Sequence, residues 1–308
     1  MILNNKNRKL IKILLFPILK HFRPGNVAMF HLGRCGSTVL AKMIQKTKGV
    51  YWHGEIFGKI LRDVYKGNKN PIDAMLHEHD FIKSNFNNDL YWKEILSEIG
   101  ADKNNIINKK YNKQIIKLIL SYIKIAGINY YGFEFKPFNN KVLNLEIVDF
   151  INELENLGIN YFIILDRKNR LRKIISSLIA HNFSDKWHYS PNDNVKRNNI
   201  FINPEKIEID FDSKPLIDYL IDYDNKFNEL NRILYSKSKL LKLYYEEDIQ
   251  KDPNKAYHKV CKFLGVKMRS GGIPLKPTNP FPIESMVSNF EVLEAYLKNS
   301  SYEWMLYD

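Results

Sequence analysis

The sequence predicts an α/β protein whose core is a parallel sheet flanked by helices. Short runs of β-branched and aromatic residues alternate with helical patterns along most of the 308 residues. Hydrophobic residues make up 44% of the chain and aromatic residues 13%, which is enough for a large buried core. Since right-handed crossovers bring the carboxyl ends of parallel strands to one edge of the sheet, we expect ligands to bind at that edge.

Four strong strand patterns and one weaker pattern carry this prediction, and each is bounded by turn or charged residues. The strong runs are Val27–Leu32, Tyr130–Phe135, Tyr161–Leu165 and Leu240–Tyr245, and the weaker run is Val50–Trp52. Helical spacing of apolar residues lies between the strands, and it is weaker over residues 66–110, which follow the run Val50–Trp52. The predicted helices are Thr38–Lys46, Lys113–Ile125, Val142–Leu157, Leu171–Asn182, Leu216–Leu234 and Pro253–Leu264.

We expect a basic amphipathic helix over residues 1–25 and a single domain over residues 26–308. Residues 8–22 are apolar with basic interruptions, and they are too short to span a bilayer, which takes about 20 apolar residues. Two interpretations of this segment stay open: a peripheral contact with anionic lipid, and a helix packed on the domain. Within the domain, the composition predicts insertions of helices and loops at about 66–110 and 184–213.

The charge and the cysteines narrow the class of protein. A net charge of +13 indicates an anionic partner such as nucleotide phosphates, nucleic acid, a lipid surface or an acidic glycan, although part of it reflects a lysine-rich background. Cys35 and Cys261 are far apart, which excludes a zinc ribbon and disfavours a disulfide-built secreted module. A reduced, cytoplasmic setting is therefore expected.

The most informative segment is the turn that follows the first predicted strand. Gly33 and Gly36 allow unusual backbone angles and a close approach of the backbone to a ligand, and a helix is expected to start at Ser37 or Thr38. Free N–H groups at a helix start bind anions, and Arg34 adds a fixed cation. The GxxxxGK[ST] pattern of ATP- and GTP-binding loops is absent, because the turn is shorter and no lysine precedes Ser37.

A second cluster of polar residues follows the strand Tyr161–Leu165. Asp166 could hold a metal ion in a nucleoside triphosphatase, but basic residues follow it at once, so the local field favours an anion. Arg167 ends the strand and Ser176 lies inside the next helix, and a guanidinium there suits a terminal phosphate. Arg172 and Lys173 are expected on a solvated face of that helix.

These segments together resemble the sulfotransferases, specifically the bacterial glycan and lipopolysaccharide type and its Golgi relatives. The loop Gly33–Thr38 is similar to their 5′-phosphosulfate loop, and Tyr161–Ser176 is similar to their strand, arginine and serine that bind the 3′-phosphate. Leu243–Asp248 and the helix after it resemble the late strand and helix of the family. Cytosolic small-molecule members usually have lysine where Arg34 stands, so this chain departs from that branch.

The resemblance implies a P-loop NTPase-like sulfotransferase fold. It implies transfer of a sulfuryl group from 3′-phosphoadenosine 5′-phosphosulfate (PAPS) to a hydroxyl of a glycan or glycolipid by in-line displacement, with no metal required. The loop residues implied to hold the 5′-phosphosulfate are Gly33, Arg34, Cys35, Gly36, Ser37 and Thr38. Arg167 and Ser176 are implied to hold the 3′-phosphate, with Ser177 as the alternative serine. Lys276–Asn279 stands where the family often has a late loop touching this phosphate, but it lacks the Arg-Lys-Gly form.

Sulfuryl transfer needs a base for the acceptor hydroxyl. Glu55, just beyond the weak second strand, is the preferred base, since related glycan sulfotransferases carry a glutamate in a similar Gly-Glu context. His53 is the runner-up, because cytosolic sulfotransferases use histidine. Lys136 ends the strand Tyr130–Phe135 at the expected ligand edge, where it would bind the sulfuryl oxygens or the acceptor.

Two other classes of function stay open at this point. The first is a P-loop-like kinase that uses ATP and Mg²⁺. The second is a nonenzymatic binder of nucleic acid or anionic lipid, although the chain has no recognised nucleic-acid signature and its cations are dispersed.

Overall fold

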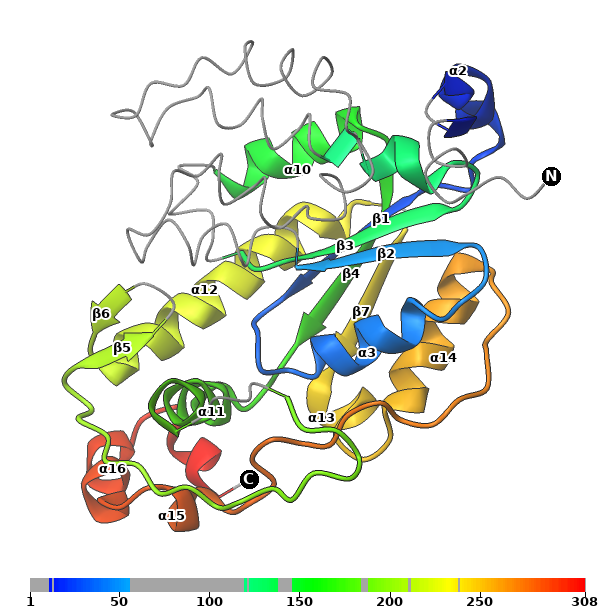
Figure 1. The fold of residues 1–308 in the computed structure, drawn as a ribbon. Coiled ribbons are helices and arrows are strands. Elements are labelled where there is room, and N and C mark those ends of the chain that lie inside the picture. The colour runs from blue at the N-terminus through cyan, green and yellow to red at the C-terminus, as the bar shows by residue number, and fades with distance from the viewer. Residues whose placement is uncertain are drawn as a thin grey trace, which may run out of the picture. The chain divides into compact units, whose positions relative to one another are not determined.

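A parallel sheet of five strands confirms the predicted α/β architecture (Figure 1). The computed structural model describes residues 11–307 except 13, 56–118, 121, 138–145, 184–187, 210–211 and 238. The strand order is β2-β3-β1-β4-β7. These strands are β1 (Asn26–His31), β2 (Val50–Glu55), β3 (Tyr130–Phe135), β4 (Ile159–Asp166) and β7 (Leu240–Tyr244).

Every predicted strand overlaps an observed one, and β3 has the predicted bounds. The weak second run extends three residues further than predicted, to Glu55. Five predicted helices are also present: α3 (Ser37–Ile44), α10 (Ile147–Asn156), α11 (Arg170–Phe183), α12 (Leu216–Tyr235) and α14 (Pro253–Leu264). The prediction over Lys113–Ile125 falls partly outside the described residues, and the insertion at 66–110 falls wholly outside them.

The chain divides into two compact units. The first comprises Met1–Met29 and Gly49–Phe162, and the second comprises Phe30–Lys48 and Ile163–Asp308. The prediction of a single domain over residues 26–308 is not tested by this division and stays a prediction.

In the first unit, β2 and β3 pair in parallel, with Val50 opposite Tyr130. All six residues of β3 are buried, as expected for a strand covered on both faces. The ring of Phe135 packs against Phe150 of α10, with the ring centroids 4.5 Å apart. This unit also contains the short helices α2 (Phe16–Leu19) and η1 (Lys20–Phe22), which occupy part of the predicted N-terminal helix. No helix in the described part of the chain is long and apolar enough to cross a membrane.

In the second unit, α3 packs beside α14 (Figure 1). Thr47, just after α3, shares a hydrogen bond of 2.7 Å with Tyr257 of α14. The start of α14 follows the usual rules for a helix N-terminus: the Asp252 side chain accepts from Asn254 N at 3.0 Å, and Pro253 occupies the first turn. Gly265 ends the helix with a left-handed φ of 64°.

The irregular stretch 184–213 is tied to the C-terminal part of the second unit where the structure describes it. Asn289 accepts from Ile202 N at 2.9 Å and donates to Ile202 O at 2.7 Å, which fixes an otherwise extended segment. The stretch continues into a small antiparallel hairpin, which the sequence did not predict, of β5 (Ile207–Ile209) and β6 (Asp212–Lys214). The other unpredicted elements are α13 (Tyr245–Asp248), α15 (Ile283–Met286), α16 (Phe290–Leu297) and η2 (Glu303–Leu306).

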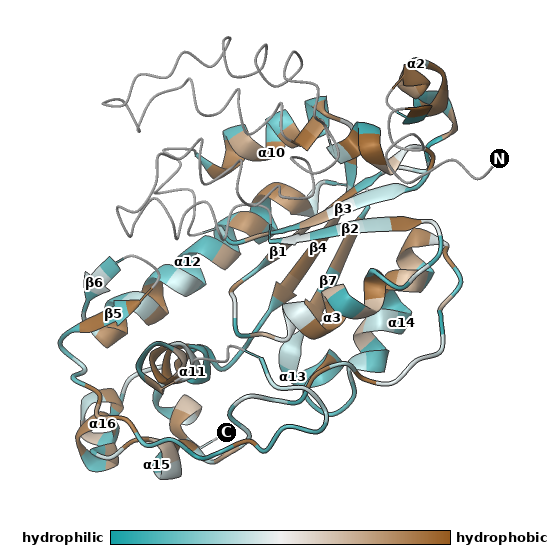
Figure 2. Ribbon diagram, in the orientation of Figure 1, coloured by the Kyte–Doolittle hydropathy of each residue, from teal (hydrophilic) through white to brown (hydrophobic). Residues whose placement is uncertain are grey.

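The hydropathy of β4 explains where this strand ends. β4 is hydrophobic along most of its length (Figure 2), and it is buried from Phe162 to Asp166. A strand of this kind ends where the chain first presents charged groups, so Asp166 and Arg167 fall at its carboxyl end.

Candidate functional site

The turn between β1 and α3 has a left-handed backbone at three of its four central positions. Gly33 has φ 79°, Arg34 has φ 53° and Gly36 has φ 78°. Arginine is disfavoured at positive φ by about 1 kcal/mol or more, so the surrounding structure must hold Arg34 there. At Gly36, an added Cβ would lie 2.6 Å from Cγ2 of Ile249, so the close packing requires glycine.

The turn leads directly into α3. The backbone hydrogen bonds of the helix begin with Leu40 N donating to Gly36 O at 3.2 Å, and no described side chain caps its N-terminus. N–H groups in the first turn of a helix lack intrahelical acceptors and attract anions. Ser37 is buried and Thr38 is half-buried at this end, while the Cys35 side chain is turned fully into the interior.

The guanidinium of Arg34 connects this turn to two distant segments of the second unit. Its Nε donates to Ser176 Oγ of α11 at 2.9 Å, and its Nη2 donates to Thr278 Oγ1 at 2.8 Å. Asn279 Nδ2 also donates to Ser176 Oγ, at 3.0 Å. The loop 276–279, which lacks the Arg-Lys-Gly form of the sulfotransferases, therefore meets both the first turn and the serine of α11.

A second guanidinium lies beside the first. Arg167 Nη1 donates to the backbone oxygen of Arg34 at 2.6 Å, and the Arg167 side chain stacks on the Tyr245 ring at 4.4 Å. Burial and the nearby charge of Arg167 lower the pKa of Arg34 to about 10, so Arg34 stays protonated at neutral pH. Two adjacent guanidiniums with little access to water favour a ligand with more than one negative charge.

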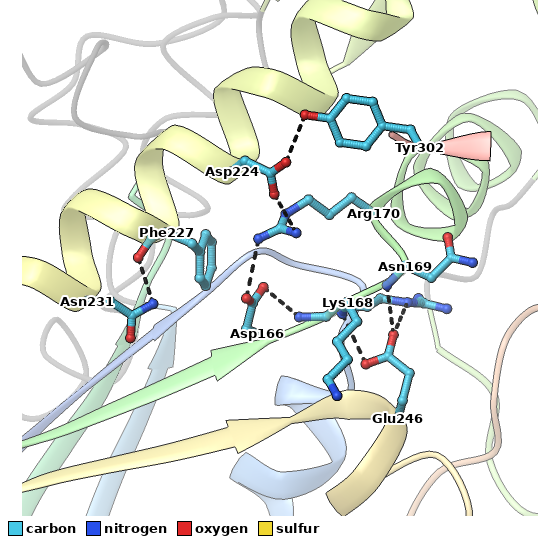
Figure 3. A network of polar contacts seen from close by, with 10 residues as sticks. Asp166, Lys168, Asn169, Arg170, Asp224, Phe227, Asn231, Glu246 and Tyr302 are labelled. Carbon is cyan, nitrogen blue, oxygen red and sulfur yellow. Dashed lines mark hydrogen bonds and ion pairs between the residues drawn. The ribbon is translucent and has the colours of Figure 1, made fainter. Parts of the chain in front are cut away.

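The turn between β4 and α11, which carries Arg167, is fixed by one carboxylate (Figure 3). Glu246 of α13 accepts from the backbone N–H of Lys168 and from that of Asn169, both at 3.0 Å. Its Oε1 is also 4.0 Å from Arg167 Nε. Because Glu246 accepts from the backbone as well as pairing with the guanidinium, it orients Arg167.

A network of charges extends behind this turn (Figure 3). Arg170 pairs with Asp166 at 3.3 Å and with Asp224 at 2.7 Å, and Tyr302 donates to Asp224 at 2.8 Å. Burial raises the pKa of Asp166 to about 6, although Arg170 and the N–H of Arg167 oppose this shift. The Asp166 carboxylate is thus engaged by an arginine and by the Arg167 N–H at 2.7 Å.

The prediction that Lys173 lies on a solvated helix face was wrong. Lys173 is 1% exposed, and its Nζ donates to Tyr223 OH of α12 at 2.6 Å. The buried ammonium group thus has the phenol oxygen as one acceptor, and it also lies 4.7 Å from the centroid of the Tyr223 ring. Arg172 is half-buried and donates to Phe281 O at 3.0 Å.

The base candidate and the strand-end lysine form an ion pair in the first unit. Lys136 Nζ is 2.9 Å from Glu55 Oε2, and about a third of each side chain is exposed. The pairing of β2 with β3 shifts between Trp52 and Glu55, so that Glu55 lies opposite Glu134. An extra residue of this kind bends a strand and re-aims the side chains beyond it. Gly54, with φ 87°, accommodates the bend.

The alternative base, His53, packs against an aromatic side chain. Its ring lies 4.1 Å from the Tyr122 ring. Burial lowers the pKa of His53 to about 4, so the imidazole is neutral at pH 7.

The predicted site residues fall into two groups. The loop Gly33–Thr38 meets Arg167 and Ser176 in the second unit, while Glu55, His53 and Lys136 belong to the first. The sequence analysis did not assign roles to several residues that the structure places at these groups: Glu134, Tyr245, Glu246, Thr278 and Asn279. Their only sequence signals were the family-like segments around Tyr245 and Thr278. Within the described residues, no three His, Cys, Asp or Glu side chains gather in a metal-binding arrangement.

Comparisons with known proteins give a limited result. No protein-family model matches the chain, and no curated protein matches it. Among solved structures, the fold is similar to a crystal structure of NadR protein in complex with NR, with a TM-score of 0.37 and 12% sequence identity. The match covers 83% of this chain and 55% of the NadR chain, so this chain spans about half of that protein.

Proposed function

We propose that this chain is a sulfotransferase that moves a sulfuryl group from PAPS to a hydroxyl of a glycan or glycolipid. The observation that carries the proposal is the contact of Arg34 with Ser176 and Arg167, because the two donor-binding motifs of the resemblance meet there. Had Arg34 and Arg167 lain in separate regions, one nucleotide could not have bridged them.

The two motifs take different parts of the donor in this proposal. The turn Gly33–Thr38 holds the 5′-phosphosulfate through its backbone N–H groups and the hydroxyls of Ser37 and Thr38. Arg167 and Ser176 hold the 3′-phosphate. Thr278 and Asn279 join them, since Thr278 accepts a hydrogen bond from Arg34 and Asn279 donates one to Ser176.

The reaction is a displacement at sulfur. The acceptor oxygen forms a bond to sulfur as the bond between sulfur and the bridging phosphate oxygen breaks, and the acceptor proton goes to a base. Negative charge develops on the bridging oxygen, where the loop N–H groups and Arg34 stabilise it. Glu55 is proposed as the base on the resemblance, and its ion pair with Lys136 orients the carboxylate.

The environment of Asp166 argues against the kinase alternative. A carboxylate that helps to hold Mg²⁺ needs free lone pairs, whereas Asp166 accepts from Arg167 N and pairs with Arg170. The guanidiniums beside Asp166 each carry five N–H donors, and such donors suit phosphate oxygens and not a metal ion.

Calorimetry with the full chain tests the proposal. We expect adenosine 3′,5′-bisphosphate, the product of the donor, to bind more tightly than ADP with Mg²⁺. Arg167→Ala should weaken the bisphosphate by more than about fivefold, or 1 kcal/mol, and leave adenosine 5′-phosphosulfate much less affected. Arg232→Ala, an exposed arginine of α12, is the matched control and should change neither affinity.

Two outcomes would contradict the proposal. A preference for ADP with Mg²⁺ would indicate a kinase, and binding that ignores the nucleotide and falls steeply with salt would indicate a nonspecific anion binder. Transfer of labelled sulfate from PAPS to an extract of the host cell envelope then identifies the acceptor class.

A further inference from the structure

An apolar stripe near the N-terminus is exposed to solvent. Its described members are Ile11, Leu14, Leu15, Ile18 and Phe22, of which Leu14, Ile18 and Phe22 are 69%, 62% and 73% exposed. The first four follow the i, i+3, i+4, i+7 spacing of one helix face. Helical hydrogen bonds connect them, with Leu15 N donating to Ile11 O and Leu19 N donating to Leu15 O, both at 2.9 Å.

The neighbouring face of the same segment is attached to the first unit. Lys12, Phe16, Leu19 and Arg23 are half-buried, and they also recur at helical spacing. Arg23 Nη1 donates to Ile123 O at 2.9 Å and to Gly127 O, and the stem of Lys12 packs on Gly127. One face is therefore anchored to the unit, so the apolar stripe is held outward instead of folding onto the core. Figure 2 shows α2 as largely hydrophobic.

The charge of the segment selects what would cover this stripe. No aspartate or glutamate precedes Glu55 in the chain, and among the described residues Lys20 is exposed beside the stripe, with His21 adjoining it. Two copies that met through this face would bring like charges together. An anionic lipid surface is complementary to both features, because basic groups contact headgroups while leucine, isoleucine and phenylalanine enter the acyl boundary.

We infer that this stripe, Ile11–Phe22, binds the surface of an anionic bilayer and holds the protein there. The stripe is too short to span the bilayer, so it lies in the interface. The inference does not depend on the proposed enzymatic function, since it uses no residue of the nucleotide site.

Flotation with lipid vesicles tests the inference on the full chain. Vesicles contain either phosphatidylcholine alone or phosphatidylcholine with about 30% phosphatidylglycerol, a fraction that gives a negative surface potential. We expect binding to the mixed vesicles that weakens as salt is raised, and little binding to phosphatidylcholine alone. The triple variant Leu14→Ser, Ile18→Ser, Phe22→Ser should lose at least tenfold in binding, and Lys20→Glu should lose several-fold.

A matched triple variant in the second unit, Ile221→Ser, Val292→Ser, Phe201→Ser, removes apolar side chains that are also exposed. It should bind the mixed vesicles like the unmodified protein. Bisphosphate affinity and the thermal unfolding midpoint report whether each variant is folded. The inference is overturned by absent binding of the unmodified protein, by equal losses in both triple variants, or by a dimer in solution that dissociates in the Leu14 triple variant.

Discussion

Arg34 Nε and Ser176 Oγ lie 2.9 Å apart, although 142 residues separate them in the chain. The contact joins the turn after β1 to the interior of α11, and Asn279 donates to the same hydroxyl. Ser177 is buried at the next position of α11, about 100° further round the helix. The structure thus distinguishes two serines that the sequence left as alternatives.

Ser176→Ala should weaken binding of adenosine 3′,5′-bisphosphate by about fivefold, the scale of one hydrogen bond to a charged group. Ser177→Ala should leave this affinity within about twofold, because its position on α11 faces away from Arg34. Calorimetry on both variants compares them directly. Equal losses in the two variants, or a larger loss for Ser177→Ala, would contradict the proposed binding of the 3′-phosphate beside Arg34.

Glu246→Ala should reduce both stability and nucleotide affinity. The substitution leaves two backbone N–H groups of the turn before α11 without their acceptor and releases Arg167, at a cost of about 2 kcal/mol in the free energy of unfolding. Glu247→Ala is the control, since Glu247 is half-exposed and forms an ion pair with the exposed Lys168. Urea unfolding and calorimetry measure the two effects, and similar behaviour of both variants would remove the positioning role of Glu246.

Glu55→Gln should lower the rate of sulfuryl transfer by about a hundredfold or more, the usual contribution of a general base. Bisphosphate affinity should not change, because the carboxylate acts on the acceptor and not on the nucleotide. Glu146→Gln, at the exposed start of α10, serves as the matched control. A rate within twofold of the unmodified protein would exclude Glu55 from the mechanism.

His53 should make stability depend on pH. Its pKa is lowered to about 4 in the folded protein, whereas an unfolded histidine titrates near 6.5. The unfolded state therefore binds the proton first as the pH falls, so stability is complete above about pH 6.5 and is lost progressively down to about pH 4. We expect a loss of about 3 kcal/mol across this window, measured by urea unfolding at a series of pH values. In His53→Gln this part of the pH dependence should disappear, and an unchanged profile would refute the assignment.

The sheet and the first turn were predictable because local patterns specify them. Val27–Leu32 and Tyr161–Leu165 are apolar runs bounded by charged residues. The glycines of the β1–α3 turn indicate a backbone with positive φ angles. The predicted end of the strand at Leu165 and start of the helix at Leu171 each lie one residue from the observed end of β4 and start of α11.

Other features depend on contacts between distant segments and leave little trace in the sequence. The shift in the β2–β3 pairing requires both strands to be placed before it exists, so the position of Glu55 opposite Glu134 could not be derived from β2 alone. Lys173 looked solvated because lysine usually is, and only the approach of Tyr223 from α12 allows its burial. Thr278 likewise became part of the site through the reach of Arg34.

The left-handed backbone of Arg34 has a consequence for engineering the protein. Glycine adopts φ 53° without a steric penalty, so Arg34→Gly removes about 1 kcal/mol of backbone strain, but it also deletes the hydrogen bonds that Arg34 donates to Ser176 and Thr278. The same change removes a guanidinium from the proposed nucleotide site, so we expect the variant to bind the nucleotide less tightly. The protein thus keeps a strained backbone at the position where the proposed reaction needs a guanidinium, and relieving that strain would remove the residue that binds.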